Sequence, residues 1–365
     1  MVSSLDSGQT WEHETTLFFG TDLREPMFLT LNDKLYFSFF QAGTNPIDFE
    51  PLGLFRIRMI RVGEWTSPEL YGHEGEVVWE IVQENGTAYS QSYSGQYGLP
   101  GDGTDLGQLD MFLNMSTDGI NWQPVGQEVI YHGGLTEVGF YFDLEGNVWG
   151  VARNEDGDES GWGSRTFFAS QDDLSSWKFV TEESDPWIYE SPKMFRHGSE
   201  LYLVARTDPE GPFWSKDNPL LNILPAWEHH LADLVSFSLR QHGTGIWHLD
   251  RSTGQLSLVL ELTGCGDTAF PSIIRYEINI IITMNGIKIN ADYQDLKMKG
   301  IIIIYILNSQ FKFHLYHHHY KIYFQNLPLT ILCTDHIHHY QKMKHSTCLL
   351  QSRKVKIYFS EIKSF

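Results

Sequence analysis

The sequence predicts an all-β fold, a propeller of four-stranded blades over residues 1–275, and three observations support this prediction. Aromatic residues make up 14% of the chain and stand among 32 glycines, a mixture that suits short strands joined by tight turns. Apolar stripes with a helical period are rare. A motif also recurs at residues 25, 80, 137, 190 and 267, and a repeat of about 50 residues is typical of propellers.

Each repeat unit is expected to form a strand, a tight turn and a second strand. The clearest copies run from 137 to 153 and from 190 to 206, and both end in Val-Ala-Arg. A third copy runs from 24 to 41, and weaker copies begin near Glu80 and Asp267. Five blade starts are counted, and six blades also fit the pattern. Third or fourth strands are expected at segments such as 54–60, 166–170 and 234–239.

The composition changes abruptly after Arg275. All 11 Trp and 30 of the 32 Gly precede this point, and the net charge changes sign, from 15 basic and 41 acidic residues before it to 11 and 5 after it. Residues 276–365 are therefore interpreted as a tail foreign to the fold, disordered or mispredicted, such as a translated A/T-rich non-coding stretch. On this hypothesis the last blade is incomplete. A genuine accessory segment is the alternative.

Charge and composition exclude several classes of partner. The acidic body argues against nucleic acid, which binds clustered Lys and Arg. The three Cys cannot form a disulfide framework, and no cofactor is expected. No metal is expected either, because the His clusters of the tail lack a pre-organised set of ligands. No signal peptide or membrane span is recognised. The sequence as written predicts a cytoplasmic protein, or an extracellular one if the N-terminus is truncated, and leaves the oligomeric state open.

Three turn motifs carry a family resemblance. Residues 4–11, Ser-Leu-Asp-Ser-Gly-Gln-Thr-Trp, match the Asp-box (BNR repeat) Ser/Thr-x-Asp-x-Gly-x-Thr-Trp, and 116–122 and 170–177 are variants of it. The chain therefore resembles the sialidase-like propellers. The resemblance implies that the box is structural, with Asp and Ser bonding the turn backbone and Trp packed between sheets. Turn roles are thus expected for Asp6, Asp118 and Asp172, and burial between blades for Trp11, Trp122 and Trp177.

Acidic residues recur at the start of the first strand of each unit, where the inner strands of a propeller line a central funnel. Glu25, Glu137 and Glu190 are interpreted as occupying one equivalent position in three blades, with Asp267 in a fourth. A glycosidase needs two or three carboxyl groups around one anomeric carbon. The segment beginning Glu190-Ser-Pro also resembles the acid-bearing strand of five-bladed arabinanase- and xylosidase-type glycosidases. That resemblance implies that Glu190 is the general acid, Glu25 the base and Glu137 the orienting residue, although Glu stands twice where that family has Asp.

The sialidase pattern instead requires three arginines that bind a substrate carboxylate, and Arg24, Arg153 and Arg206 are the candidates, with Asp267 as a further substrate-binding residue. The predicted function is a carbohydrate-active protein of the glycoside hydrolase type, exo-sialidase-like or arabinanase-like, with a saccharide or glycoconjugate as partner. It is inactive as written if the tail replaces residues of the last blade. A non-catalytic glycan-binding propeller and a structural one, in which Arg and Glu of neighbouring blades pair with each other, are the alternatives.

Overall fold

The computed structural model describes residues 1–3, 10–44, 49–95, 109–240, 242–276 and 279–287, and short strands at 301–307, 310–315, 324–325 and 356–357. For some residues in these ranges, Asp267 among them, only the backbone is described. This part of the chain is almost entirely β, with two helices, α1 (Pro219–Ile223) and α2 (Ala226–Leu239). The predicted all-β propeller class is confirmed.

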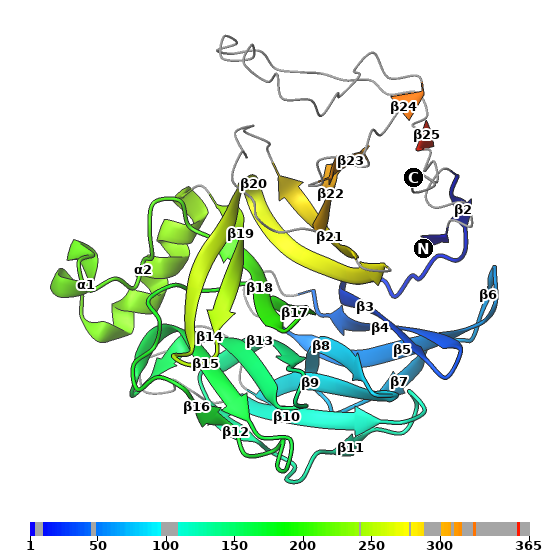
Figure 1. Cartoon of the computed structure of the whole chain (residues 1–365), viewed down its shortest axis with the longest axis horizontal. Coiled ribbons are helices and arrows are strands. Elements are labelled where there is room, and N and C mark those ends of the chain that lie inside the picture. Colours follow the sequence, from blue (N-terminus) through cyan, green and yellow to red (C-terminus); the bar gives the residue numbers. More distant parts are fainter. Residues whose placement is uncertain are drawn as a thin grey trace, which may run out of the picture.

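Four antiparallel sheets follow one another along the chain and form the blades (Figure 1). Blade 1 contains β3 (Leu23–Leu31), β4 (Lys34–Ala42), β5 (Pro51–Arg61) and β6 (Glu64–Trp65), with β7 (Glu69–Tyr71) also paired to β5. Blade 2 contains β8 (Val77–Glu84), β9 (Thr87–Gly95), β10 (Leu109–Ser116) and β11 (Gln123–Pro124), with β12 (Tyr131–Gly133) also paired to β10. Blade 3 contains β13 (Leu135–Phe142), β14 (Val148–Asp158), β15 (Gly161–Ala169) and β16 (Lys178–Phe179). Blade 4 contains β17 (Lys193–His197), β18 (Glu200–Thr207), β19 (Gly243–Asp250) and the first part of β20 (Gln255–Tyr276).

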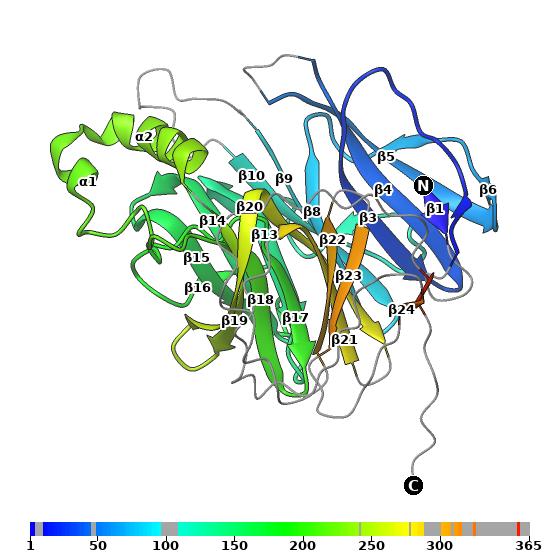
Figure 2. The same cartoon turned by 90° about the horizontal axis from the view of Figure 1, so that it is seen from above.

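The first strands of the blades lie next to one another, in the order β3, β8, β13, β17. Because each sheet extends outward from its first strand, this order gives the radial arrangement of a propeller, which Figure 1 shows with β3, β8, β13 and β17 near the centre. Figure 2 shows the same sheets after a turn of 90°. The starts of β13 and β17 are therefore neighbours, although more than fifty residues of chain separate them.

The chain after blade 4 departs from the simple meander. The second part of β20 pairs antiparallel with β21 (Asn279–Ile287), which pairs in parallel with β22 (Ile301–Leu307), and β22 pairs with β23 (Gln310–Leu315). Two further two-stranded sheets join β1 (Val2–Ser3) to β2 (Glu12–His13) and β24 (Phe324–Gln325) to β25 (Lys356–Ile357). The proposed boundary after Arg275 falls at the end of β20, and the foreign origin of the residues beyond it stays a prediction.

The hairpins of the repeat unit form where the sequence predicts them. Asn32 and Asp33 join β3 to β4 with positive φ angles of 52° and 59°, and Asn85 and Gly86 join β8 to β9 with φ of 48° and 78°. Two consecutive positive φ angles are the signature of type I′ turns, whose twist suits an antiparallel hairpin. The second strand β4 is buried on both faces, which explains its nearly continuous apolar sequence.

The hydrophobic core lies between the blades. Tyr36 of blade 1 packs with Ala88 and Trp122 of blade 2, and Trp149 of blade 3 packs with Leu203 of blade 4. A larger cluster connects blades 1, 2 and 3. Because these side chains come from sheets that share no strand pairing, burial of apolar surface joins one blade to the next.

One predicted strand is wrong, because residues 234–239 belong to α2. The third strand of blade 4 is β19, which follows the helix. A short apolar run such as Leu234-Val-Ser-Phe-Ser-Leu239 fits a buried strand and one side of a helix equally well. Pro219 stands at the start of α1 behind an Asn218 cap and Pro225 precedes α2, positions that favour helix initiation.

The turn between β10 and β11 confirms the predicted structural role of Asp118. Its Oδ1 accepts hydrogen bonds from the backbone N–H groups of Ile120 and Asn121, each at 2.8 Å. Backbone hydrogen bonds from Asn121 and Ile120 hold the pKa of Asp118 well below its usual range. Gly119 takes a positive φ of 75°, and Tyr36 donates its hydroxyl to the Asp118 carbonyl at 2.7 Å. The turn therefore also connects blade 2 to blade 1.

The other two turn motifs differ from expectation. Between β15 and β16, Asp173 accepts hydrogen bonds from Ser175 N at 3.2 Å and Oγ at 2.7 Å, while Asp172 is exposed. Asp6 lies outside the described residues. Trp122 and Trp177 are half-buried, but Trp11 is 48% exposed, so its predicted burial is wrong. The reason is that Trp11 leads into the separate two-stranded sheet β1–β2.

Replacing Asp118 by alanine is expected to lower the free energy of unfolding by about 1–2 kcal/mol, because several turn hydrogen bonds lose their acceptor. Urea unfolding of the purified chain measures the change. Asp172→Ala is the matched control in the corresponding motif of blade 3, and it is expected to change stability by less than about 0.5 kcal/mol. Equal losses in the two variants would contradict the assignment.

Candidate functional site

Two of the predicted acids, Glu137 and Glu190, meet at the junction of blades 3 and 4. Glu137 lies near the start of β13 and Glu190 shortly before β17, and each is 9% exposed. Arg153 of β14 contacts both, because its Nη1 is 3.2 Å from Glu137 Oε1 and 3.4 Å from Glu190 Oε1. The contact between β13 and β17 thus brings two distant carboxyl groups to one guanidinium.

The two Val-Ala-Arg segments explain why arginines reach this junction. In each hairpin the final Arg lies opposite the start of the first strand, so Arg153 pairs with Thr136 and the Arg206 N–H donates to the Glu190 carbonyl at 2.8 Å. Arg206 Nη1 forms an ion pair with Glu190 Oε2, and Arg153 Nη2 forms one with Glu155. We call Glu137, Arg153, Glu155, Glu190 and Arg206 the carboxylate–arginine network.

The predicted equivalence of the three glutamates is wrong by one residue. Glu25 and Glu137 both have positive φ, at 47° and 31°, where the register of their strand pairs shifts. In blade 4 the residue with positive φ (51°) is Ser191, so Glu190 lies one position earlier. The count from the shift to the final Arg differs because five residues separate Phe142 from Val148 in the turn of blade 3, whereas two separate His197 from Glu200 in blade 4.

The structure places the remaining candidates elsewhere or leaves them undescribed. Arg24 forms an ion pair with Asp22 at 2.6 Å and its side chain is 50% exposed. Glu25 is half-buried in the bulge of β3, in blade 1. Asp267 lies in β20, but its side chain is outside the described part of the structure. Of the predicted site residues, Glu137, Glu190, Arg153 and Arg206 come together.

Burial and neighbouring charge shift the acidity of the network. Burial raises the pKa of Glu137 to about 7, and the charges of Glu190 and Glu155 raise it as well, whereas Arg153 and the Ser191 N–H act to lower it. The Ser191 N–H donates to Glu137 Oε2 at 2.8 Å. For Arg153, burial lowers the pKa, but the three carboxylates outweigh it and raise the pKa overall. Glu137 is therefore able to hold a proton near neutral pH while Arg153 stays charged.

Sequence reasoning missed the helix that accompanies this network. Asp233, Phe237 and Arg240 lie four and three residues apart on α2 and at its C-cap, a spacing that places them on one helix face. Burial raises the pKa of Asp233 to about 7, with Glu190 and Glu155 contributing. Figures 1 and 2 show α2 outside the blades, beside blades 3 and 4. The spacing of these three residues was the signal available in the sequence.

A second buried acid, Glu80, connects three blades. Its Oε2 accepts a hydrogen bond from Phe140 N at 2.9 Å, and its Oε1 is 4.0 Å from Lys193 Nζ. Burial raises the pKa of Glu80 to about 7, although Lys193 acts to lower it. Because its partners are a backbone amide of β13 and a lysine of β17, we interpret Glu80 as part of the joint between blades 2, 3 and 4.

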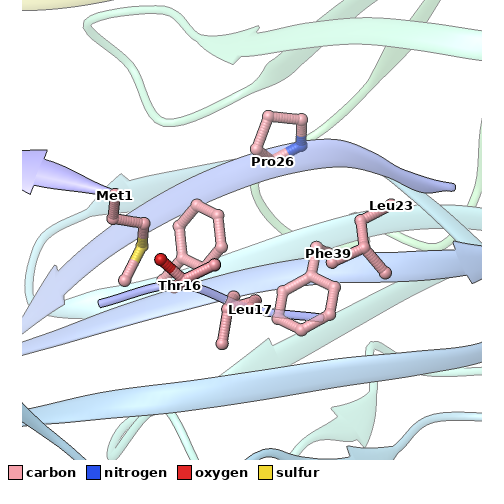
Figure 3. A pocket seen from close by; sticks show the side chains of 7 residues that line it. Met1, Thr16, Leu17, Leu23, Pro26 and Phe39 are labelled. Atoms are coloured by element: carbon pink, nitrogen blue, oxygen red, sulfur yellow. The ribbon is translucent and has the colours of Figure 1, made fainter. Parts of the chain in front are cut away.

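Two hollows lie on blade 1, away from the network. The first has a volume of about 230 Å³, and Figure 3 shows its lining of Met1, Thr16, Leu17, Leu23, Pro26, Phe37 and Phe39. The second, of about 460 Å³, shares Thr16 and Leu17 with the first and reaches Trp65. Neither is lined by a network residue, and the first offers no carboxyl group. We place the candidate site at the network, because the predicted chemistry requires paired carboxyl groups.

The described residues contain no group of three or more His, Cys, Asp or Glu arranged to hold a metal ion. In the same part of the chain, no helix is long and apolar enough to cross a membrane. Fold and site together define a β-propeller with a buried carboxylate–arginine network at the inner ends of two neighbouring blades.

No protein-family model matches the chain, and no curated protein matches it. Solved structures do match it. A β-fructofuranosidase of glycoside hydrolase family 32 from Bombyx mori is 14% identical with a TM-score of 0.43, and the match covers 71% of this chain and 53% of that one. An endo-arabinase from Bacteroides thetaiotaomicron is 12% identical with a TM-score of 0.44, covering 73% and 89%. A protein of unknown function from Dyadobacter fermentans is 14% identical with a TM-score of 0.47, covering 77% of each chain. This chain thus spans about half the length of the Bombyx mori enzyme.

Proposed function

We propose that this chain is a carbohydrate-active propeller of the glycoside hydrolase type, with Glu137 and Glu190 as its reacting carboxyl groups. The observation that supports this most directly is the sharing of one guanidinium nitrogen by two buried carboxyl groups from neighbouring blades. Glycoside hydrolysis needs one protonated and one ionised carboxyl group near a single bond. Such a pair arises where the local environments give two nearby carboxyl groups different pKa values.

The charges around the two glutamates favour Glu137 as the acid. Its pKa of about 7 keeps much of it protonated at neutral pH. Glu190 instead forms ion pairs with two guanidinium groups, those of Arg153 and Arg206. We therefore assign the general acid to Glu137 and the ionised partner to Glu190, which exchanges the roles that the resemblance implied.

The state of the arginines favours a neutral sugar over a sialoside. Arg153 and Arg206 are paired with protein carboxylates of the network, and Arg24 is paired with Asp22. A carboxylate-bearing substrate would have to displace these internal partners. The acidic body of the protein also repels anions. These observations support the arabinanase-like version of the proposal.

A non-catalytic propeller is the second candidate, and one observation favours it. The Arg153 guanidinium lies between Glu137 and Glu190, where a reacting sugar would have to sit, and both acids are buried. Paired buried charges of this kind also occur as purely structural salt bridges. In that case the protein would bind a glycan without hydrolysing it, or would hold its blades together with this network.

A panel of substrates separates these functions. The full chain is incubated with aryl glycosides of neutral sugars and with an aryl sialoside, and calorimetry measures binding of the corresponding free sugars. Release of the aryl alcohol from a neutral glycoside, with no release from the sialoside, is the expected result. Sugar binding without turnover on any substrate would establish the glycan-binding alternative. If the protein neither binds nor hydrolyses any of these sugars, the structural role is the one that remains.

A further inference from the structure

The two Val-Ala-Arg segments share one more feature, an acidic residue two positions after the arginine. The segments read Val151-Ala-Arg-Asn-Glu155 and Val204-Ala-Arg-Thr-Asp208. Glu155 belongs to β14, and residues two positions apart on a strand point to the same face of the sheet. Its side chain is 24% exposed, beside that of Arg153. The proposed chemistry uses Glu137 and Glu190 and leaves this third carboxylate without a role.

The two equivalent acids contact different parts of the protein. In blade 3, Glu155 forms an ion pair with Nη2 of Arg153, in its own strand. In blade 4, Asp208 forms an ion pair with Arg240, the residue that ends helix α2. The contact between Glu155 and Arg153 is therefore a specific feature of blade 3, and Asp208 offers a natural comparison for it.

Three groups of nitrogen contacts fix the guanidinium of Arg153. Its Nε donates to Thr136 Oγ1 at 2.9 Å, and its Nη2 donates to Glu155. Thr136 lies directly opposite Arg153 in the ladder between β13 and β14, so both anchors come from the hairpin that carries the arginine. The remaining nitrogen, Nη1, lies 3.2 Å from Glu137 Oε1 and 3.4 Å from Glu190 Oε1.

This arrangement keeps the guanidinium from binding either reacting glutamate with two hydrogen bonds. An arginine pairs most strongly with a carboxylate when two N–H groups donate in parallel to its two oxygens. Here Thr136 and Glu155 engage Nε and Nη2, and the two reacting glutamates share Nη1. Glu137 thus receives less compensation for burial than a full pair would give, which agrees with its raised pKa of about 7.

We propose that Glu155 is a positioning residue, which with Thr136 holds the Arg153 guanidinium so that a single nitrogen faces the two reacting glutamates. Without Glu155, the freed Nη2 joins Nη1, and both donate to Glu137, whose ionised form this fork favours. Glu155 thereby keeps Glu137 able to carry the proton that the leaving group receives. The effect on turnover rests on the proposed function, whereas the hold on Arg153 rests on the contacts of its anchors.

Other ionisable groups surround this cluster, and a pH experiment has to separate them from Glu137. They come from three neighbouring elements and interact by charge with the cluster or with one another: Tyr93 of β9, Glu190 and Arg206 of blade 4, and Asp233 and Arg240 of α2 and its C-cap. Burial raises the pKa of Asp233 to about 7, the same range as that of Glu137. The measurement therefore has to identify Glu137 by its own substitution.

Difference infrared spectroscopy of the full chain follows Glu137 without substrate. In each background, the spectrum of the protein that also carries Glu137→Gln is subtracted, which leaves the carboxyl band of Glu137. We expect this band to disappear around pH 7 in the wild type and about one pH unit lower in Glu155→Met. Glu155→Gln removes the same charge but keeps an oxygen that can accept from Nη2, so its shift should be clearly smaller. Asp208→Asn, in the equivalent position of blade 4, is the matched control and should titrate like the wild type.

The pH dependence of kcat/KM for a phenyl glycoside is the second measurement. The fall of the rate above neutral pH is expected to move about one unit lower in Glu155→Met. The rate of this variant should then decrease about tenfold at pH 8 and change little at pH 5, because fewer molecules carry the proton at high pH. A merely structural role of Glu155 would lower the rate by the same factor at both pH values.

Several results would overturn the proposal. An unshifted titration in Glu155→Met is one, and equal shifts in Glu155→Met and Glu155→Gln, which would show an effect of charge alone, are another. If circular dichroism shows that Glu155→Met does not fold, Glu155→Asp decides, because it keeps the charge and withdraws the acceptor by one methylene group. An unshifted titration in that variant rejects the positioning role.

Failure of the proposed function gives a different result. A shifted titration of Glu137 in a protein that hydrolyses no glycoside would keep the positioning role and reject the proposed function. Turnover by the wild type, with the same pH profile in Glu155→Met, would do the reverse.

Discussion

Replacing Arg153 by methionine is expected to lower the free energy of unfolding by about 3–5 kcal/mol at pH 8, because it removes the guanidinium that three carboxylates of the network share. Glu137, Glu155 and Glu190 all pair with this guanidinium, whose side chain is 15% exposed. Methionine fills a similar volume without charge. The loss of stability therefore measures the missing ion pairs more than the creation of a cavity. Chemical unfolding measures the change.

The pH dependence of this loss has a definite sign. Without Arg153 the pKa of Glu137 rises further in the folded state, because burial and the neighbouring carboxylates are no longer offset by the guanidinium. A raised folded-state carboxyl pKa stabilises the protein at low pH, and that contribution is lost as the pH rises. The destabilisation is therefore expected to be smaller at pH 5 than at pH 8.

Arg61→Met is the control for removing an arginine. Arg61 pairs with Glu64, but its side chain is 80% exposed. Such a surface pair contributes about 0–1 kcal/mol, with little dependence on pH in this range. A loss of less than about 1 kcal/mol in Arg153→Met would show that the network does not depend on this residue.

Replacing Glu137 by glutamine is expected to lower the turnover of a phenyl glycoside by about 10²–10⁴-fold, because glutamine cannot donate the proton that the leaving oxygen requires. The introduced side chain retains an amide oxygen that can accept the hydrogen bond from Ser191 N. A dinitrophenyl glycoside, whose leaving group departs without a proton, is expected to lose much less. Comparison of the two substrates therefore isolates acid catalysis from general damage to the site.

The pH dependence of the hydrolysis rate tests the same variant in a second way. An acid must be protonated to act, so the wild-type rate is expected to fall as the pH rises through about 7, the pKa of Glu137. This fall should be absent in Glu137→Gln. Glu84→Gln, which alters the ion pair between Glu84 of blade 2 and Arg196 of blade 4, is the control and should keep the wild-type profile. Equal losses on the phenyl and dinitrophenyl substrates would reject Glu137 as the acid.

Residue patterns in the sequence predicted part of the candidate site. The recurrence of acids at blade starts led to Glu137 and Glu190, and the Val-Ala-Arg repeat led to Arg153 and Arg206. The same reasoning misplaced Arg24, which pairs with Asp22 in blade 1. It also gave Glu25 and Glu190 the same position, although Glu25 lies at the register shift of blade 1 and Glu190 lies one residue before the positive-φ residue Ser191 of blade 4.

The sequence by itself determined the all-β class, the repeat of hairpins and the turn that Asp118 holds. These features depend on contacts between residues a few positions apart, such as the positive φ angles at Asn85 and Gly86, and local chemistry encodes them.

Only the tertiary structure decided that Glu137 and Glu190 share Arg153, that the pKa of Glu137 is raised and that Phe237 of α2 contacts Arg206 of the network. Each of these depends on which distant segments exclude water from one another. Burial in the folded protein sets the free-energy cost of a charge. This burial cannot be read from the spacing of residues along the chain.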